Sequence, residues 1–280
     1  MLESTDDVPN WTEFQPSRGW LGRLDFAELW SYRALGLQLA LRDLKLRYKQ
    51  TAIGVGWAVL QPLAGVAIFS IFFGRLANVP SEGIPYPVFV YTGLVIWWYV
   101  SESVLAAADS LIKDHKLVTT VYFPRMLAPF AALLPGLVDL AISLPILGAL
   151  MAVYGVSPPI QVLTLPVWCL GAVGVALGAG LWLSALNVLY RDVRYAFGFL
   201  LQIWLFASPV VFPSSLVTGY WRYLYAVNPM VGVIDGLRWA VLGRANLGGA
   251  NLVSLVSATA FLVTGAVYFR RMERQFADRI

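Results

Sequence analysis

Three carboxylates lie inside long apolar stretches of this sequence, where an ionised side chain is costly. They are Glu102, Asp109 and Asp139, and Asp139 is the nearest to the middle of its stretch. Charges at such depth usually serve a function, so a proton relay has to be considered. A water-lined cavity or an arginine from another helix would also explain Asp139. A proton-coupled carrier usually has more than one acid at mid-depth, so it is only an alternative.

A second group with chemical meaning is aromatic. Trp97, Trp98 and Tyr99 adjoin in one apolar stretch. Aromatic faces and hydroxyls suit sugar rings, although packing against lipid or helices is the simpler interpretation. Neighbouring residues point in different directions on a helix, so at most two of these three can line one pore. The candidates for channel or substrate contact are Trp57, Gln61, Trp97, Trp98, Tyr99 and Trp204.

No motif for enzyme catalysis is recognisable in this sequence. No lysine follows a glycine, so the phosphate loop G-x-x-x-x-G-K-[ST] is absent and we expect no bound ATP. The one histidine, His115, stands among charged residues, as surface histidines do, and the one cysteine, Cys169, stands in an apolar run. No Cys/His cluster suits zinc and no Ser/His/Asp set can be assembled, so we expect no metal, no cofactor and no catalytic residues. A membrane transferase is the weakest alternative.

The elements that must position these residues are membrane helices. The chain is 59% hydrophobic and 13% charged, about half the charged fraction of ordinary soluble domains. Several apolar runs reach 18 or more residues, which predicts an all-α membrane protein. The basic pI of about 9.2 is explained by charge placement at the membrane, so no nucleic-acid partner is expected.

The apolar runs predict six membrane-spanning helices. Residues 51–73 carry no charge and cover about 34 Å as a helix, enough for a hydrocarbon core of about 30 Å. In span 4, Gly174 and Gly178 form a pair of small residues that favours close helix packing. The expected spans are about 52–74, 88–109, 127–153, 162–188, 196–213 and 252–269.

Two further segments precede the first span. Residues 1–25 are expected to form an irregular cytoplasmic arm, and the rest of the chain, 26–280, one transmembrane domain. Residues 26–50 show helical periodicity with a basic side, which predicts an amphipathic helix on the membrane surface. Its apolar stripe comprises Phe26, Trp30, Ala34, Leu37, Leu41, Leu44 and Tyr48.

Residues 214–250 are too short and too polar for a seventh span. Two semi-apolar pieces, about 215–227 and 230–242, are split by Asn228 and Pro229. Each covers about 20 Å as a helix, so a pair of re-entrant or interfacial helices is expected. Their charged residues should face protein or water.

The basic residues predict the orientation. With six spans and a cytoplasmic N-terminus, 16 of the 20 Lys and Arg residues lie in segments on the cytoplasmic side. The remaining four are Arg75, Arg222, Arg238 and Arg244. The excess of positive charge on the inside favours a cytoplasmic location for both termini.

Four motifs carry a resemblance to a known family. They are LRDLKLRYKQTAIGVGWAVLQPL at 41–63, FPR at 123–125, NVLYRDVRY at 187–195 and the NP pair at 228–229 followed by Arg238. In their order along the spans they resemble the membrane subunits of ABC-2-type polysaccharide exporters, which move O-antigen, capsule or teichoic acid chains out of bacteria. The resemblance extends over about residues 26–271 and is strongest in the first motif.

The resemblance implies a function for the whole assembly. It implies a homodimeric permease in the bacterial inner membrane that works with two copies of a separate ABC ATP-binding subunit. That subunit would hold the ATP and magnesium, so this chain would not be an enzyme by itself. The implied substrate is a lipid-linked glycan, which would enter between spans 1 and 5 of opposite protomers. An ABC-2-type exporter of a small lipophilic molecule remains an alternative.

The resemblance also implies roles for individual regions. The helix at 26–50 and the loop at 110–125 would meet the ATPase, and the 214–250 pair would cap the channel on the periplasmic side. The coupling candidates are Arg42, Asp43, Arg47, Tyr48, Lys113, Asp114, His115, Lys116 and Arg125. The periplasmic gate candidates are Tyr220, Trp221, Tyr223, Tyr225, Asn228, Pro229 and Arg238.

Overall fold

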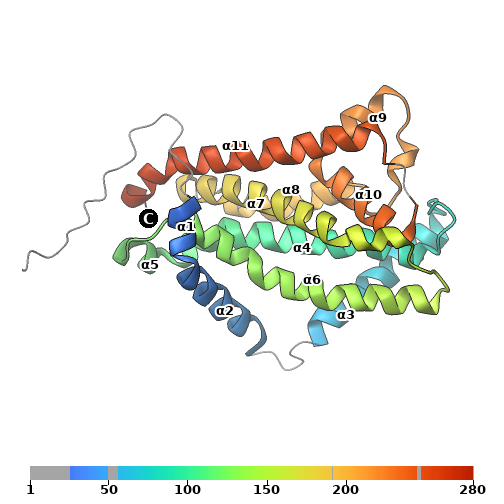
Figure 1. Ribbon diagram of the computed structural model, residues 1–280, viewed down its shortest axis with the longest axis horizontal. Coiled ribbons are helices and arrows are strands. Elements are labelled where there is room, and N and C mark those ends of the chain that lie inside the picture. The colour runs from blue at the N-terminus through green and yellow to red at the C-terminus, as the bar shows by residue number, and fades with distance from the viewer. Residues whose placement is uncertain (1–25, 50–55, 191, 245–246, 280) are drawn as a thin grey trace, which may run out of the picture.

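The computed structural model describes residues 26–49, 56–190, 192–244 and 247–279, and every regular element in these ranges is helical. The expected arm at 1–25 lies outside them. Figure 1 shows the longest helices running side by side along the long axis of the molecule. These are α4 (Tyr86–Lys113), α6 (Leu127–Val153), α7 (Leu165–Leu189) and α11 (Gly249–Arg279).

Within the described residues, five helices are long and apolar enough to cross a membrane, and they correspond to five of the six expected spans. The first is α3 (Gly56–Phe69), which continues through a π-helical turn, η1 (Ser70–Leu76). The fourth begins in a short 3-10 helix, η2 (Ile160–Thr164), before α7. The apolar lengths are Val59–Leu76, Tyr86–Lys113, Leu127–Val153, Ile160–Leu189 and Gly249–Glu273.

The expected span at 196–213 is not confirmed as a membrane-crossing helix. Its helix, α8 (Val193–Phe206), has 14 residues and covers about 21 Å, which is less than a hydrocarbon core. The chain then turns through Ala207–Val211. Pro209 lacks an N–H and disfavours a helical conformation for the residue before it, so the helix ends early.

Helix α4 is the centre of the bundle. It contacts α6 along one side and α7 along another, and its residues are buried from Val88 to Leu111 on nearly every face. A helix that is apolar all round is expected to lie inside a bundle. Small residues permit this close packing, because a Cβ at Gly180 of α7 would stand 2.6 Å from the Cβ of Ala107.

The predicted small-residue pair is confirmed at one of its two positions. Gly178 of α7 lies against the backbone of α11, where an added Cβ would stand 2.9 Å from Leu262. Gly265 of α11 meets the carbonyl of Gly178 in return, so the two backbones approach each other directly. Gly174 has its nearest neighbour 4.0 Å from an added Cβ and is not in close contact.

The N-terminal segment forms two helices, α1 (Phe26–Ser31) and α2 (Arg33–Lys49), where one was expected. Figure 1 shows α2 inclined to the long helices. Its packed face comprises Gly36, Leu39 and Ala40, whereas Trp30, Leu37 and Leu41 of the predicted stripe are exposed. The stripe is therefore not the face that packs on the bundle.

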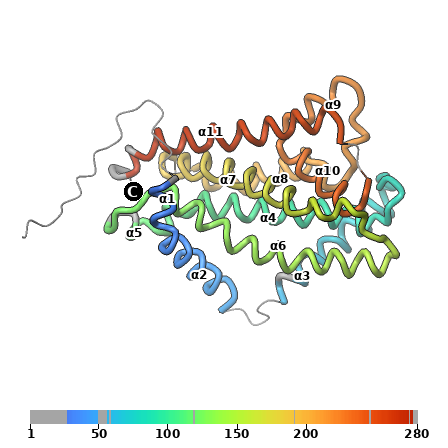
Figure 2. The backbone as a smooth tube through the Cα atoms, viewed as in Figure 1, coloured from blue at the N-terminus to red at the C-terminus, as the bar shows by residue number. Residues whose placement is uncertain are grey.

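Of the two helices expected between residues 214 and 250, only the second is formed over its expected length. The piece at 215–227 holds a 3-10 turn, η3 (Ser214–Leu216), and a six-residue helix, α9 (Tyr220–Tyr225), so it is mostly irregular. The piece at 230–242 is α10 (Pro229–Leu242), which is buried along most of its length. Figure 1 shows α9 at one end of the bundle. Figure 2 shows that the described chain begins and ends together at the opposite end.

Candidate functional site

A polar and aromatic cavity of about 130 Å³ lies among α2, α3, α4 and α6. Its polar groups come from α2, from Gln61 of α3, and from the middle of α4 and α6. It unites predicted coupling residues with predicted channel residues, which the sequence analysis had kept apart. The lining residues are Arg47, Tyr48, Trp57, Gln61, Pro62, Val95, Trp98, Tyr99, Glu102, Gly136, Asp139, Leu140 and Ser143.

Arg47 is the electrostatic centre of this cavity. One guanidinium nitrogen pairs with Glu102 of α4, and the other lies 3.0 Å from a carboxylate oxygen of Asp139 on α6. Burial disfavours the charged guanidinium, but Glu102 and Asp139 outweigh that effect, and the pKa of Arg47 is raised. A single arginine thus serves two carboxylates, and the three side chains together carry one net negative charge.

Tyr48, the next residue of α2, completes the arrangement. Its hydroxyl donates a hydrogen bond to the carboxylate of Asp139. Burial and the neighbouring Asp139 raise the pKa of Tyr48 to about 12, so the phenol is protonated and remains a donor at neutral pH. Ser143, one turn further along α6, donates to the backbone carbonyl of Asp139 at 2.8 Å.

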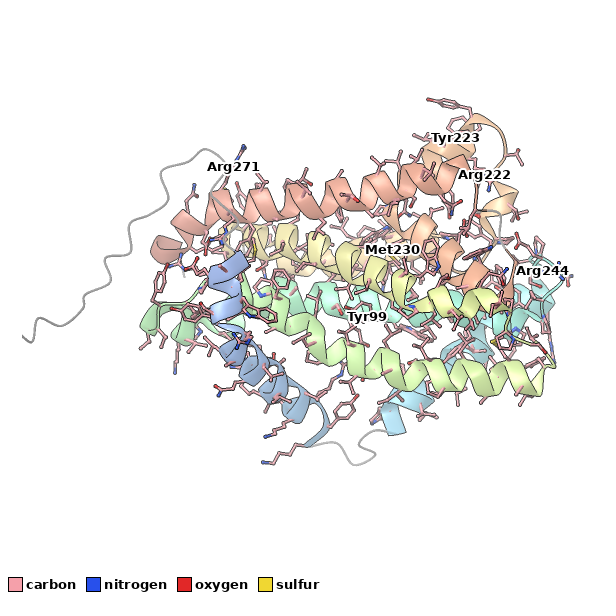
Figure 3. The ribbon with its side chains drawn as sticks, viewed as in Figure 1. Tyr99, Arg222, Tyr223, Met230, Arg244 and Arg271 are labelled. Atoms are coloured by element: carbon pink, nitrogen blue, oxygen red, sulfur yellow. The ribbon has the colours of Figure 1, made fainter. Side chains whose placement is uncertain are left out.

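The aromatic wall of the cavity is built by α3 and α4. Trp98 lies across Gly65, where an added Cβ would stand 2.7 Å from the indole ring, so only glycine permits this contact. The ring of Tyr91 meets that of Trp98 edge-on at 6.5 Å between centroids. Trp57 is exposed at the rim, and Tyr99, labelled near the middle of the bundle in Figure 3, is buried at the inner wall.

Two of the six channel candidates face elsewhere. Trp97 is buried on the opposite side of α4, where its ring meets that of Trp204 edge-on at 5.8 Å. The indole N–H of Trp204 donates to the side chain of Asn228 at 2.9 Å. These residues hold α8 against the start of α10. Of the three adjoining aromatic residues, Trp98 and Tyr99 line the cavity and Trp97 does not.

A second group of charges lies one turn and a half closer to the start of α2. Arg42 pairs with Asp114 at 2.8 Å and with its neighbour Asp43 at 2.9 Å. Lys113, at the end of α4, pairs with Asp43 at 2.9 Å. The hydrogen bond to Asp114 raises the pKa of Arg42 despite its partial burial. Four predicted coupling residues thus fasten α2 to the end of α4.

The remaining coupling candidates lie at the same end of the bundle. Lys113 and Asp114 lead into α5 (His115–Thr120), in which His115 is near the backbone carbonyl of Ile112 and Lys116 is exposed. Arg125 donates to the carbonyl of Glu273 on α11 at 2.6 Å, and its own backbone N–H reaches the Glu273 carboxylate. The FPR motif therefore joins this segment to the final helix.

Asp109, the third carboxylate, is at this end too. Its carboxylate lies 3.5 Å from Arg194 and accepts a hydrogen bond from the side chain of Asn187 at 3.1 Å. Both partners belong to the NVLYRDVRY motif. The motif thus fastens the junction of α7 and α8 to α4. Asp109 has no place in the cavity.

Arg238, a predicted gate residue, is a structural anchor. Its side chain is buried at 2% exposure and donates to the carbonyls of Pro209 at 2.5 Å and Val210 at 2.7 Å. The guanidinium also lies over the ring of Phe89, 3.7 Å from its centroid. These carbonyls would lack partners where α8 ends, so Arg238 stabilises the turn that replaces the rest of the expected span.

The other gate candidates divide between anchors and surface residues. Asn228 caps α10 by accepting from the backbone N–H of Met230 at 3.0 Å, and Pro229 occupies the first helical position, where proline is favoured. Tyr225 packs against Phe212, with 6.4 Å between ring centroids. The exposed aromatic residues of α9 are Tyr220, Trp221 and Tyr223, the last of them labelled in Figure 3.

Glu102 and Asp139 were expected inside apolar stretches, but their position beside Arg47 was not predicted. They stand 55 and 92 positions from it in the chain, and no local pattern joins such residues. The available signal was the balance of charge, because acids within apolar stretches require a cation and Arg47 directly precedes the adjoining span. Among the described residues, no group of three His, Cys, Asp or Glu side chains could hold a metal ion.

Comparison with known proteins places the chain in a family. The sequence profile described as ABC-2 type transporter matches residues 36–242. The O-antigen export system permease protein RfbA of Myxococcus xanthus is 30% identical over 258 residues, which cover 90% of this chain and 98% of the relative. The protein of the same name from Klebsiella pneumoniae is 25% identical over 240 residues, 85% of this chain and 91% of the relative.

A third relative is named for a different polysaccharide. The polysialic acid transport protein KpsM of Escherichia coli is 24% identical over 244 residues, which cover 84% of this chain and 92% of the relative. The family profile and the relatives span most of the described bundle, including the cavity and the charged groups at the ends of α2 and α4. The chain is a multi-pass membrane protein that belongs to the ABC-2 type transporter family.

Proposed function

We propose that this chain is the membrane-spanning permease subunit of an ATP-driven exporter that moves a lipid-linked polysaccharide across the bacterial inner membrane. The polymer would be O-antigen-like, a capsule or a teichoic acid. The observation that carries the proposal is the cavity in which Trp57, Gln61, Trp98 and Tyr99 adjoin polar groups at mid-depth. The relatives, an O-antigen export system permease protein and a polysialic acid transport protein, support the same substrate class.

The chemistry of the cavity suits a sugar unit. Indole and phenol rings offer flat apolar surfaces for the C–H faces of a pyranose, and carboxylates and amides bind its hydroxyls. The cavity volume of about 130 Å³ is close to that of a cavity of about 150 Å³ that takes one benzene ring, so within one chain it would contact part of a sugar ring at a time. Weak contacts with one unit at a time would let a polymer advance.

The assembly that we propose is a homodimer with two copies of an ABC ATP-binding subunit. ATP and magnesium belong to that partner, and this chain would hold no cofactor and catalyse no reaction by itself. Both termini would be cytoplasmic, since the described chain begins and ends at the same end of the bundle and the basic residues favour that side. The remaining span, the fifth in chain order, would comprise α8 and the turn after it.

The charged face of α2 suggests how movement would reach the cavity. Arg42 and Arg47 are five residues apart on one rigid helix, about 7.5 Å along its axis. The first pairs with the end of α4 and the second with the middle of α4 and α6. Pressure from the ATPase on α5 or on α2 would therefore shift Arg47 and Tyr48 relative to the cavity.

The test is ATPase stimulation in liposomes that contain both subunits. We expect undecaprenyl-linked glycan to raise ATP hydrolysis several-fold, and a lipophilic molecule without sugars to leave it unchanged. The reverse pattern would favour the second candidate, an ABC-2-type exporter of a small lipophilic molecule. That candidate is favoured by one observation, which is that the cavity within a single chain is small.

A proton-coupled carrier is disfavoured by the surroundings of Asp139. A proton relay needs a carboxylate that can gain and lose a proton, whereas Asp139 pairs with Arg47 and accepts from Tyr48. Both carboxylate oxygens are therefore engaged by protein partners. Transport by the purified chain in the absence of any ATPase would revive this alternative.

A further inference from the structure

A second cavity, of about 580 Å³, lies at the end of the bundle away from the described termini. Its walls come from the loop between η1 and α4, from η3 and the start of α9, and from the end of α10. None of its lining residues was singled out as a gate or channel candidate. Figure 3 labels Arg222 and Arg244 at this end of the molecule.

The walls of this outer cavity contain three left-handed backbone positions. They are Glu82, with φ 56°, and Gly219 and Gly243, each with φ 64°. Glycine adopts such angles without penalty, but Glu82 does so at a cost of about 1 kcal/mol or more. The hydroxyl of Ser215 donates to the Glu82 carboxylate at 2.7 Å and holds it there. Retained strain of this kind is typical of binding sites.

The charge of the outer cavity is the strongest observation. Only four arginines and no lysines were expected on this side, and Arg238 is buried in bonds to the 209–210 turn. Of the other three, Arg222 and Arg244 both line this cavity. Among the lining residues Glu82 holds the one carboxylate, so the lining itself carries one net positive charge, and Asp235 lies behind it, where its carboxylate accepts from Ser214. Basic charge that is scarce on this face is therefore concentrated at one place.

The depth of the outer cavity suggests its ligand. Loop 77–85 connects the ends of two apolar helices, η1 and α4, so the cavity lies at the level where the membrane-spanning segments end. That level is the headgroup region of a bilayer. Guanidinium groups bind phosphate through paired N–H donors, and the hydroxyls and backbone of a polar loop bind neighbouring hydroxyl groups. The volume falls in the range of small-molecule sites.

We propose that the outer cavity binds a phosphate ester flanked by hydroxyl groups, through Arg222 and Arg244. This chemistry is shared by the headgroup of an anionic glycerol phospholipid and by soluble glycerol phosphate. The site does not depend on the identity of the exported molecule. It would fix the loops around α9 to the outer membrane surface, or take a phosphate ester that arrives from solution.

The experiment measures lipid retention by native mass spectrometry of the full chain released from nanodiscs. With equal parts of phosphatidylglycerol and phosphatidylcholine, we expect preferential retention of phosphatidylglycerol. The double variant Arg222→Gln/Arg244→Gln should lower that retention at least about tenfold, the loss expected for two charge-assisted contacts. Arg75→Gln is the matched control, because Arg75 is an exposed arginine at the same end and does not line the cavity.

A second arm separates the two sources of the phosphate ester. In detergent without phospholipid, sn-glycerol phosphate should stabilise the wild-type chain against heat, and the double variant should show no shift, if the soluble ligand is taken. Stabilisation by phosphatidylglycerol alone assigns the site to the lipid headgroup. If the double variant does not fold, Arg244→Gln alone should lower lipid retention about threefold. Retention equal to that of Arg75→Gln in every variant would overturn the proposal.

Discussion

Replacing Arg47 by glutamine tests the electrostatic arrangement of the mid-bundle cavity. The change removes the one cation that Glu102 and Asp139 share and leaves two carboxylates facing each other. Breaking a fully buried pair costs about 3–5 kcal/mol, and breaking an exposed one about 0–1 kcal/mol. The three side chains are 39%, 34% and 21% exposed, which places this site between the two cases, at about 2 kcal/mol.

Asparagine at position 139 is expected to behave differently. Arg47 keeps its partner Glu102, and Tyr48 can donate to the amide oxygen as it does to the carboxylate. Asp139→Asn should therefore cost less than about 1 kcal/mol and leave export largely intact. In the double variant Arg47→Gln/Asp139→Asn, one of the two carboxylates is gone, so part of the loss should be recovered.

The assay is thermal unfolding of the three variants and the wild type in one detergent, followed as a double-mutant cycle. At about 2–4 °C per kcal/mol for a chain of this size, Arg47→Gln should lower the Tm by about 4–8 °C. Asp139→Asn should lower it by less than about 3 °C, and the double variant should recover about half of the loss. Additive losses, or a larger loss for Asp139→Asn, would refute the shared-arginine reasoning. Abolished export by a well-folded Asp139→Asn chain would favour a proton role.

Three further predictions follow from the packing and the cavity. Gly178→Ala should lower the Tm by several degrees, because its Cβ would stand 2.9 Å from the backbone of α11, whereas Gly174→Ala should be nearly neutral. Arg238→Lys keeps a charge but loses the paired donors to the 209–210 carbonyls, so a destabilisation of about 2–4 kcal/mol is expected in the same unfolding assay. Gln61→Ala should reduce glycan-stimulated ATP hydrolysis several-fold without changing the Tm, because Gln61 lines the cavity. The control is Leu63→Ala, since Leu63 is exposed and does not line the cavity. Equal effects of the two variants would show that Gln61 does not contact the substrate.

The long helices could be predicted from the sequence because length and apolar composition decide them. At 127–153 the predicted and observed limits coincide, although this helix contains Asp139, Pro135 and Pro145. The run at 196–213 is as apolar but does not form one helix. Its end depends on Pro209 and on Arg238, which lies 29 positions further along and takes the freed carbonyls. Composition alone does not report such a contact.

The candidate site was predicted in parts and not as a whole. The acids, the aromatic residues and the basic face of α2 were each visible in the sequence. Their meeting at one cavity depends on the inclination of α2, which brings Arg47 and Tyr48 to the middle of α4 and α6. The face of α2 that packs on the bundle differs from the predicted apolar stripe, and it includes Gly36, where an added Cβ would stand 3.0 Å from the Leu127 side chain.

The central claim is that this chain moves glycan only when a separate ATPase drives it. The most direct measurement is the uptake of radiolabelled lipid-linked glycan, scored by protection from an added glycosidase, in inside-out vesicles that contain the chain with or without its ATP-binding partner. Protection that requires the partner, magnesium and hydrolysable ATP is the predicted result. Protection by the chain alone, or with the partner but without ATP, would contradict the claim.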